Sequence, residues 1–117
     1  MFTIKQRIKS FKYAWEGVSK FFLEEHNTIL HLLATITMVV LGVFAGVSRV
    51  EWLALVIVTG FVWVAEIFNT AIEKMMDHVS TERRPEIKYI KDLSAAGVLI
   101  ASLVALITGC IVFIPKM

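Results

Sequence analysis

The stretch WLALVIVTGFVWVAEIFNTAIEKMMDHV, residues 52 to 79, begins as an apolar run and ends in acidic residues. Residues 52–65 carry no formal charge, but these 14 residues are too few to cross a bilayer. A helix needs about 20 apolar residues to span ~30 Å of hydrocarbon. The helical pattern continues through Glu66 to His78. We therefore predict one membrane-spanning helix over residues 52–78, whose last turns bring carboxylates to the edge of the bilayer.

Two further apolar runs predict two further spans. Residues 27–48 contain no Asp, Glu, Lys or Arg, and residues 93–115 form a run of 23 residues without formal charge. The 117-residue chain is 57% hydrophobic and 19% charged, whereas a soluble domain is about half apolar and about a quarter charged. The sequence thus predicts an all-α integral membrane protein, with spans over residues 27–48, 52–78 and 93–115 and a single domain over residues 1–117.

Small residues within these runs indicate where helices can approach one another closely. Gly42 and Gly46 are spaced four residues apart in the first span. In the last span small residues recur every four positions, at Gly97, Ala101, Ala105 and Gly109. Such a ridge lets another helix pack tightly against it. Cys110 lies in the same apolar run, and we expect its thiol to be buried.

The segment before the first span has the pattern of an amphipathic helix, which we predict over residues 1–26. Apolar residues at three- and four-residue spacings form one stripe, and most lysines lie off it. The stripe consists of Ile4, Ile8, Phe11, Trp15, Val18 and Phe22. A basic helix with aromatic residues on its apolar side is typical of the membrane interface. The alternative is a soluble helix packed on a globular core.

The distribution of Lys and Arg predicts the topology. The N-terminal segment has five of these residues, and the end of the second span together with the segment after it has five, whereas the two remaining ones lie on the other side. The positive-inside rule therefore places the N-terminus and residues 74–92 in the cytoplasm. We expect a multi-pass protein of the bacterial inner membrane with its acidic cluster at the cytoplasmic face. The net charge of +2 is too small to indicate nucleic acid as a partner.

The polar residues that end the second span share one side of the predicted helix. At 100° per residue, Glu66, Asn69, Glu73 and Asp77 fall within an arc of about 80°. An ionisable residue at membrane depth costs ~2.5 to 3.5 kcal/mol and therefore usually marks function. Glu66 is surrounded by apolar residues, which favours a desolvated, basic carboxylate. For Asp77 a solvated helix end is an equally good interpretation.

A second acidic segment, FFLEEHN, lies at the same predicted face, just before the first span. Glu25 of this segment can join Glu73 around one hydrated divalent cation. Mg²⁺ suits such a site, because it prefers few protein carboxylates when phosphates fill its other positions. Lys91, Arg83 and Arg84 are then available for phosphate oxygens. The sequence has no glycine-rich loop of the G-x-x-x-x-G-K type.

Several motifs together resemble the prokaryotic diacylglycerol kinase family of small integral-membrane lipid kinases. They are EIFNTAIEKMMD, followed fourteen residues later by KDLSAAGVLIASLVALITG, and the shorter FKYAWEG, EEHN and FIPKM. The resemblance covers nearly the whole chain. It implies ATP-dependent phosphorylation of a membrane lipid alcohol, either diacylglycerol to phosphatidic acid or undecaprenol to undecaprenyl phosphate. EEHN and FIPKM resemble the undecaprenol group more closely.

The resemblance also implies roles for individual residues. Glu66 matches the family's general base and Asn69 its partner in the site, while Glu25 and Glu73 match the carboxylates that hold Mg²⁺. The positions that match the nucleotide side are Tyr13, Asp77, Glu82, Arg84, Lys91 and Asp92. Arg83 and Arg84 differ from the usual residues of the family's loop over ATP, and Arg7 matches a family arginine one position out of register.

The resemblance implies a homotrimer with active sites near the protomer boundaries. Its partners would be the lipid bilayer, a membrane lipid alcohol and ATP. Two other classes of function fit parts of the sequence. One is a small transport or channel subunit with an acidic cytoplasmic mouth, in which the stripe lines a path for cations or protons. The other is a non-catalytic membrane protein whose stripe binds a partner. A transport path needs polar residues at several depths, whereas this chain gathers them at one end.

Overall fold

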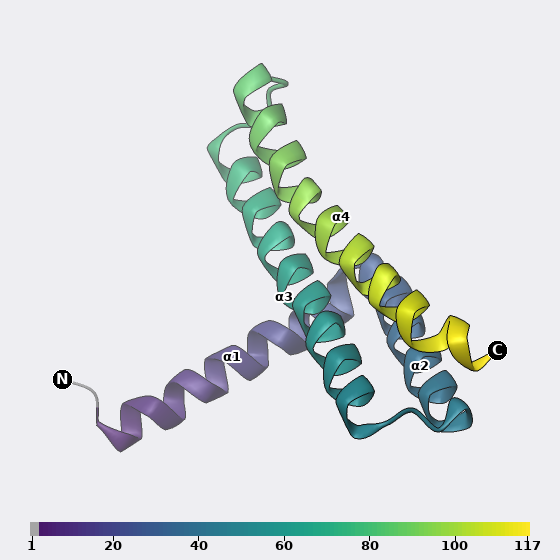
Figure 1. Ribbon diagram of the computed structural model, residues 1–117. Coiled ribbons are helices and arrows are strands. Elements are labelled where there is room, and N and C mark those ends of the chain that lie inside the picture. The colour runs from purple at the N-terminus through teal and green to yellow at the C-terminus, as the bar shows by residue number, and fades with distance from the viewer. Residues whose placement is uncertain (1–2) are drawn as a thin grey trace. The chain divides into compact units, whose positions relative to one another are not determined.

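Four α-helices account for most of residues 3–117, which are the residues that this computed structural model describes. They are α1 (Ile4–Glu24), α2 (Asn27–Ala45), α3 (Arg49–Val79) and α4 (Pro85–Phe113), and a 3₁₀ helix, η1 (Ile114–Lys116), follows (Figure 1). No strand occurs among these described residues. Helices α2, α3 and α4 are each long and apolar enough to cross a membrane. The prediction of an all-α fold with three such helices is confirmed.

The chain divides into two compact units, one ending at Ala34 and one covering residues 35–117. The first unit contains α1, which begins with a capping box. The Thr3 side chain accepts a hydrogen bond from the Gln6 backbone N–H, and the Gln6 side chain accepts one from the Thr3 N–H. These two bonds satisfy N–H groups that a helix start leaves without partners. Along the predicted apolar stripe Ile4 and Phe11 are exposed, as an interfacial helix requires.

In the second unit, two tryptophan side chains of α3 contact the part of α2 that belongs to this unit. Trp63 donates its indole N–H to the Thr35 hydroxyl over 2.9 Å. The Trp52 ring lies on Gly42 so closely that an added Cβ would come within 2.4 Å of a ring carbon. Gly46 has φ of +63° and ends α2, a conformation that glycine adopts without steric cost. The two glycines thus serve different purposes, one making space for an indole and the other forming a turn.

Helices α3 and α4 run antiparallel and lie side by side along most of their length (Figure 1). Helix α4 begins at Pro85, eight residues before the predicted span begins at Leu93. Proline is tolerated at a first helical position because its missing N–H would have no partner there. The segment around Pro85 is therefore a helix start at the polar end of the pair. This early start brings Lys88 and Lys91 onto α4.

A small apolar core lies at the end of the α3–α4 pair that is farthest from the turn between these helices. Buried Val47, Leu55 and Val112 form it, and Met38, Trp52 and Phe113 pack around them. At the same end Lys116 and Glu51 form an ion pair over 3.1 Å. Glu51 also completes a capping box with Ser48 at the start of α3. The core and the ion pair fix where η1 meets the start of α3.

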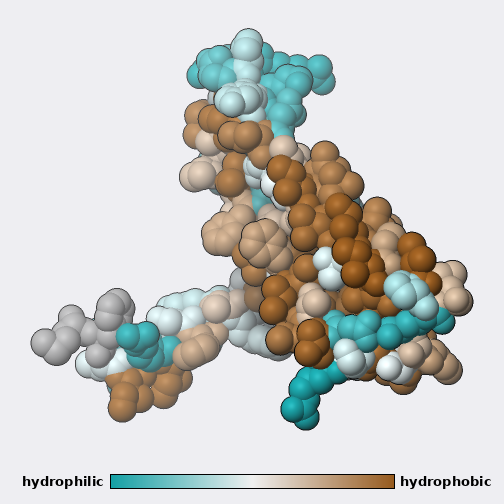
Figure 2. Space-filling view, in the orientation of Figure 1, coloured by the Kyte–Doolittle hydropathy of each residue, from teal (hydrophilic) through white to brown (hydrophobic). Residues whose placement is uncertain are grey.

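Most of the apolar surface of α3 and α4 is not covered by the described chain. Figure 2 shows hydrophobic surface along these helices and hydrophilic surface over the turn between them. On the ridge of small residues Ala101 is buried, whereas a Cβ added to Gly97 or Gly109 would meet nothing within 4 Å. The expectation of a buried thiol at Cys110 is wrong, because this residue is exposed on the uncovered surface of α4. Lipid or another protein must cover these surfaces in a membrane.

Candidate active site

Helix α3 carries the predicted acidic stripe from a buried to an exposed environment. Glu66 is 4% exposed and Asn69 is 8% exposed, and these are the two buried polar residues of the helix. Glu73 and Asp77, further along α3, are exposed. The stripe therefore presents a desolvated carboxylate and amide at its inner end and solvated carboxylates at its outer end. This order matches the one that the sequence predicts.

The buried end of the stripe is tied to α4 by a hydrogen bond. The Ser94 hydroxyl donates to Asn69 Oδ1 over 2.8 Å. The sequence analysis did not single out Ser94. Its position did carry a signal for a contact between helices, because a serine in an apolar span often forms a hydrogen bond to a neighbouring helix. Which helix and which partner it contacts depends on the register of α3 against α4, which only the coordinates supply.

One turn nearer the exposed end of α4, an ion pair joins the two helices. Lys91 Nζ lies 2.6 Å from Asp77 Oδ1, with the two side chains 36% and 60% exposed. The structure thus brings together two of the residues predicted to contact the nucleotide. A pair this exposed contributes between about 0 and 1 kcal/mol to stability. Its lysine therefore remains available to a more highly charged partner such as a phosphate.

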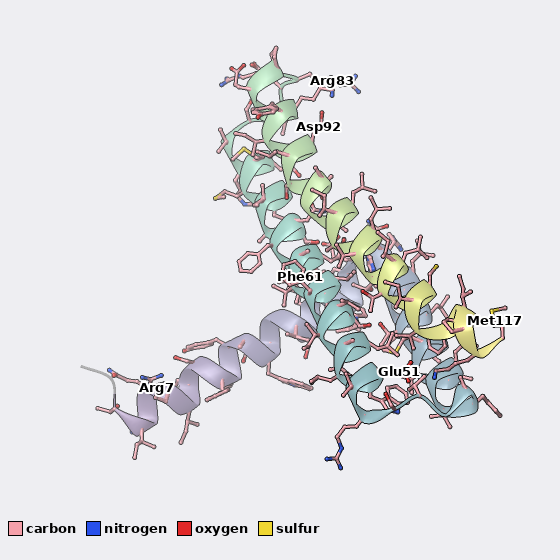
Figure 3. The ribbon with its side chains drawn as sticks, in the orientation of Figure 1. Arg7, Glu51, Phe61, Arg83, Asp92 and Met117 are labelled. Atoms are coloured by element: carbon pink, nitrogen blue, oxygen red, sulfur yellow. The ribbon has the colours of Figure 1, made fainter. Side chains whose placement is uncertain are left out.

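Further ion pairs surround the turn between α3 and α4. Lys88 contacts Asp92 over 2.5 Å, one helical turn apart on α4. Arg84 Nε lies 3.4 Å from Glu82 Oε2, so two residues predicted for the nucleotide loop contact each other. Arg83 and Asp92 lie at this end of the helix pair, whereas Glu51 and Met117 lie at the opposite end (Figure 3). The ion pairs of α3 and α4 are thus divided between two ends.

The remaining predicted site residues, Glu25 and Tyr13, belong to the first unit. Glu25 is the C-terminal cap of α1 and is partly buried, with its backbone N–H bonded to the Phe21 carbonyl over 3.1 Å. Tyr13 is 64% exposed on α1. The approach of Glu25 and Tyr13 to Glu73 stays a prediction. Within residues 3–117, no three His, Cys, Asp or Glu side chains gather into a group able to hold a metal ion.

Taken together, the second unit provides a buried carboxylate and amide on a helix of membrane-spanning length. A lysine and further charged groups lie at the water-exposed end of the same helix pair. This is an arrangement that can take a proton from an alcohol at the bilayer edge and neutralise phosphate charge beside it. The fold and this stripe define a small helical membrane protein with a buried carboxylate and a charged end on one helix pair.

Comparison with known proteins agrees with this class. Residues 12–113 match the family described as prokaryotic diacylglycerol kinase. The chain is 29% identical over 109 residues to the undecaprenol kinase of Bacillus subtilis (strain 168), covering 93% of this chain and 89% of that protein. It is 32% identical over 104 residues to the diacylglycerol kinase of Escherichia coli (strain K12), covering 89% and 85%. The chain belongs to the prokaryotic diacylglycerol kinase family.

This result confirms the family that the sequence motifs resemble and, with it, the prediction of a lipid kinase. The three apolar helices and the family agree with a bacterial membrane protein. The roles of the individual residues, the cation, the topology and the assembly stay predictions.

Proposed function

We propose that this chain transfers the γ-phosphate of ATP to the hydroxyl of a membrane lipid alcohol, with Glu66 as the general base. The observation that carries the proposal is the burial of Glu66, 4% exposed, on a helix long enough to cross the bilayer. Placing a carboxylate in such surroundings costs free energy, and an ionisable residue found there usually has a function. Membership of a family of lipid kinases supports that use.

In the proposed step, Glu66 accepts the proton of the lipid hydroxyl while the hydroxyl oxygen attacks the γ-phosphorus. The bond from the γ-phosphorus to the oxygen bridging to the β-phosphorus breaks, and ADP leaves with that oxygen. No covalent enzyme intermediate is needed, because phosphoryl transfer depends mainly on positioning and charge neutralisation. Asn69, one helical turn from Glu66, donates from its amide to the groups that react.

The exposed end of the helix pair suits the nucleotide. Lys91 exchanges its contact with Asp77, 2.6 Å away, for phosphate oxygens when ATP binds. The other residues that we propose to contact the nucleotide are Tyr13, Glu82, Arg84 and Asp92. Each of them carries a polar group that can contact a base, a ribose or a phosphate.

The donor chemistry of this end also fits Mg²⁺. Glu73 offers exposed carboxylate oxygens, and Glu25 is the second proposed ligand. Magnesium in kinases is commonly held by one or two carboxylates together with the phosphates of the substrate. When bound, Mg²⁺ would neutralise charge on the phosphates during transfer. The role proposed for Glu73 and Glu25 is to supply carboxylate oxygens to the cation.

The proposal assigns the turn between α3 and α4 to the cytoplasmic face, where ATP is available and where the Lys and Arg residues gather. The homotrimer implied by the family resemblance is supported by open space at Gly97 and Gly109, where another helix can approach. The substrate is a long-chain lipid alcohol. The two relatives named above differ in this respect, one being an undecaprenol kinase and the other a diacylglycerol kinase.

The test is a phosphorylation assay with purified protein in lipid nanodiscs and radiolabelled ATP. Diacylglycerol and undecaprenol are supplied side by side, with Mg²⁺ or with a chelator. We expect Mg²⁺-dependent labelling of at least one lipid, and the ratio of turnover on the two identifies the substrate. Equal labelling of a lipid without a hydroxyl, or no labelling of either alcohol, would contradict the proposal.

A further inference from the structure

The hydrogen bond between Ser94 and Asn69 connects two helices of membrane-spanning length at the buried end of the acidic stripe. The Ser94 hydroxyl is the donor and Asn69 Oδ1 is the acceptor, 2.8 Å apart. Asn69 is 8% exposed, so little solvent reaches its amide. Side-chain bonds between helices of this kind contribute ~0.6 kcal/mol on average in a membrane and at most ~1.7 kcal/mol. Stability alone is therefore a weak reason to place this pair beside Glu66.

The geometry of the amide indicates what else the bond does. The carboxamide is planar, with Oδ1 and Nδ2 on opposite sides of Cγ, and its oxygen only accepts while its nitrogen only donates. A hydroxyl that donates to Oδ1 therefore restricts rotation about the last side-chain torsion. It also directs both N–H groups of Asn69 away from Ser94. Without this bond the last torsion is broad and roughly two-fold, so the oxygen and the nitrogen can exchange places.

We propose that Ser94 is a positioning residue that holds the Asn69 amide with its N–H groups directed to the reacting groups beside Glu66. This inference rests on the proposed function, because it assigns Asn69 a role in the transfer step. Glu66 and Asn69 are three residues apart and therefore share one side of α3. Ser94 acts from α4 and touches neither substrate. It sets the orientation of a group that does.

The first variant is Ser94→Ala, which removes the hydroxyl and leaves the helix backbone unchanged. We expect kcat to fall about 3- to 20-fold, the range that one interhelical hydrogen bond in a membrane corresponds to. The KM for MgATP should stay within about 2-fold, because Lys91 and Asp77 keep their separate contact at the nucleotide end. Ser94→Thr keeps a hydroxyl and should recover most of the lost turnover.

The matched control is Ser102→Ala, the same change on α4 about two turns further from the polar end. Its kcat should stay within about 2-fold of the wild-type value. A general loosening of α4 would affect both serine variants, whereas loss of the Asn69 contact affects only Ser94→Ala.

A double-mutant cycle separates positioning from packing. In an Asn69→Ala background, Ser94→Ala should change the residual turnover by less than about 2-fold, since the amide it orients is gone. An equal loss in both backgrounds, or wild-type kcat in Ser94→Ala, would overturn the inference. The same cycle read by thermal unfolding tests the contact without reference to the reaction. Coupling in stability combined with unchanged turnover would refute positioning and leave the proposed function intact, whereas a wild-type protein that labels no lipid would refute both.

Discussion

Replacing Glu66 with Gln tests the base directly, because the change removes the proton acceptor and keeps the length and shape of the side chain. Gln has nearly the same size and shape as Glu, so no cavity forms at a position that is only 4% exposed. General base catalysis contributes about 10²- to 10⁴-fold to rate. We therefore expect kcat to fall by that factor, which corresponds to about 2.7 to 5.5 kcal/mol in the activation barrier. The free energy of unfolding should change by less than about 1 kcal/mol, since the substitution is isosteric.

The assay measures transfer of labelled phosphate from ATP to the preferred lipid alcohol in nanodiscs, under saturating conditions for both substrates. Glu51→Gln is the matched control, because it makes the same chemical change on α3 at the opposite end from the site (Figure 3). It breaks the ion pair with Lys116, 3.1 Å away, and should lower stability by at most about 1 kcal/mol with turnover nearly unchanged. Turnover in Glu66→Gln within about 3-fold of wild type would remove Glu66 from the role of base.

Two further variants test the packing and the nucleotide end. Gly42→Ala places a Cβ within 2.4 Å of the Trp52 ring, so we expect a loss of about 1 to 3 kcal/mol in thermal unfolding. Gly60→Ala is its control, because a Cβ there meets nothing within 4 Å, and equal stability losses in the two variants would contradict this account. Lys91→Met should raise the KM for MgATP by about 10-fold or more, since a charge-assisted contact is lost, whereas Lys116→Met at the far end should leave it unchanged. Equal effects of the two lysine changes would show that only the overall charge matters.

The helices were predictable from the sequence because their signals are local. Two charge-free runs of sufficient length identify two spans, and a shorter run whose helical pattern continues through Glu66 identifies the third. Each predicted span overlaps one long apolar helix. The start of α4 was less predictable, since Pro85 both breaks a preceding helix and begins a new one. The contact of Trp52 with Gly42 was not predictable, because it depends on how the turn at Gly46 folds α3 back against α2.

For the candidate site, too, the features of a single helix were predictable and the contacts between helices were not. Residues on one helix share a face by arithmetic, so the stripe from Glu66 to Asp77 follows from the spacing alone. Contacts between α3 and α4 need the register of one helix against the other, which no spacing within a single helix contains. The bond between Ser94 and Asn69 and the pair of Lys91 with Asp77 are both of this kind. The sequence selected Asp77 as a member of the stripe and Lys91 as a phosphate contact, but it did not pair them, and it did not select Ser94.

The arrangement of charge along α3 bears on the alternative of a transport or channel subunit. A path across a membrane needs polar groups at successive depths. On α3 no Asp, Glu, Lys or Arg lies between Glu51 and Glu66, and at the far end Glu51 is joined to Lys116. Arg49 also lies at this far end, whereas the ion pairs made by Lys91, Lys88 and Arg84 gather around the turn between the two helices (Figure 2). Polar chemistry confined to one end suits a reaction between a water-soluble nucleotide and a lipid headgroup, both of which reach that depth without crossing the bilayer. An ion moving through the same helices would meet about 14 residues without formal charge, or roughly 21 Å of rise, and this favours the kinase over the channel.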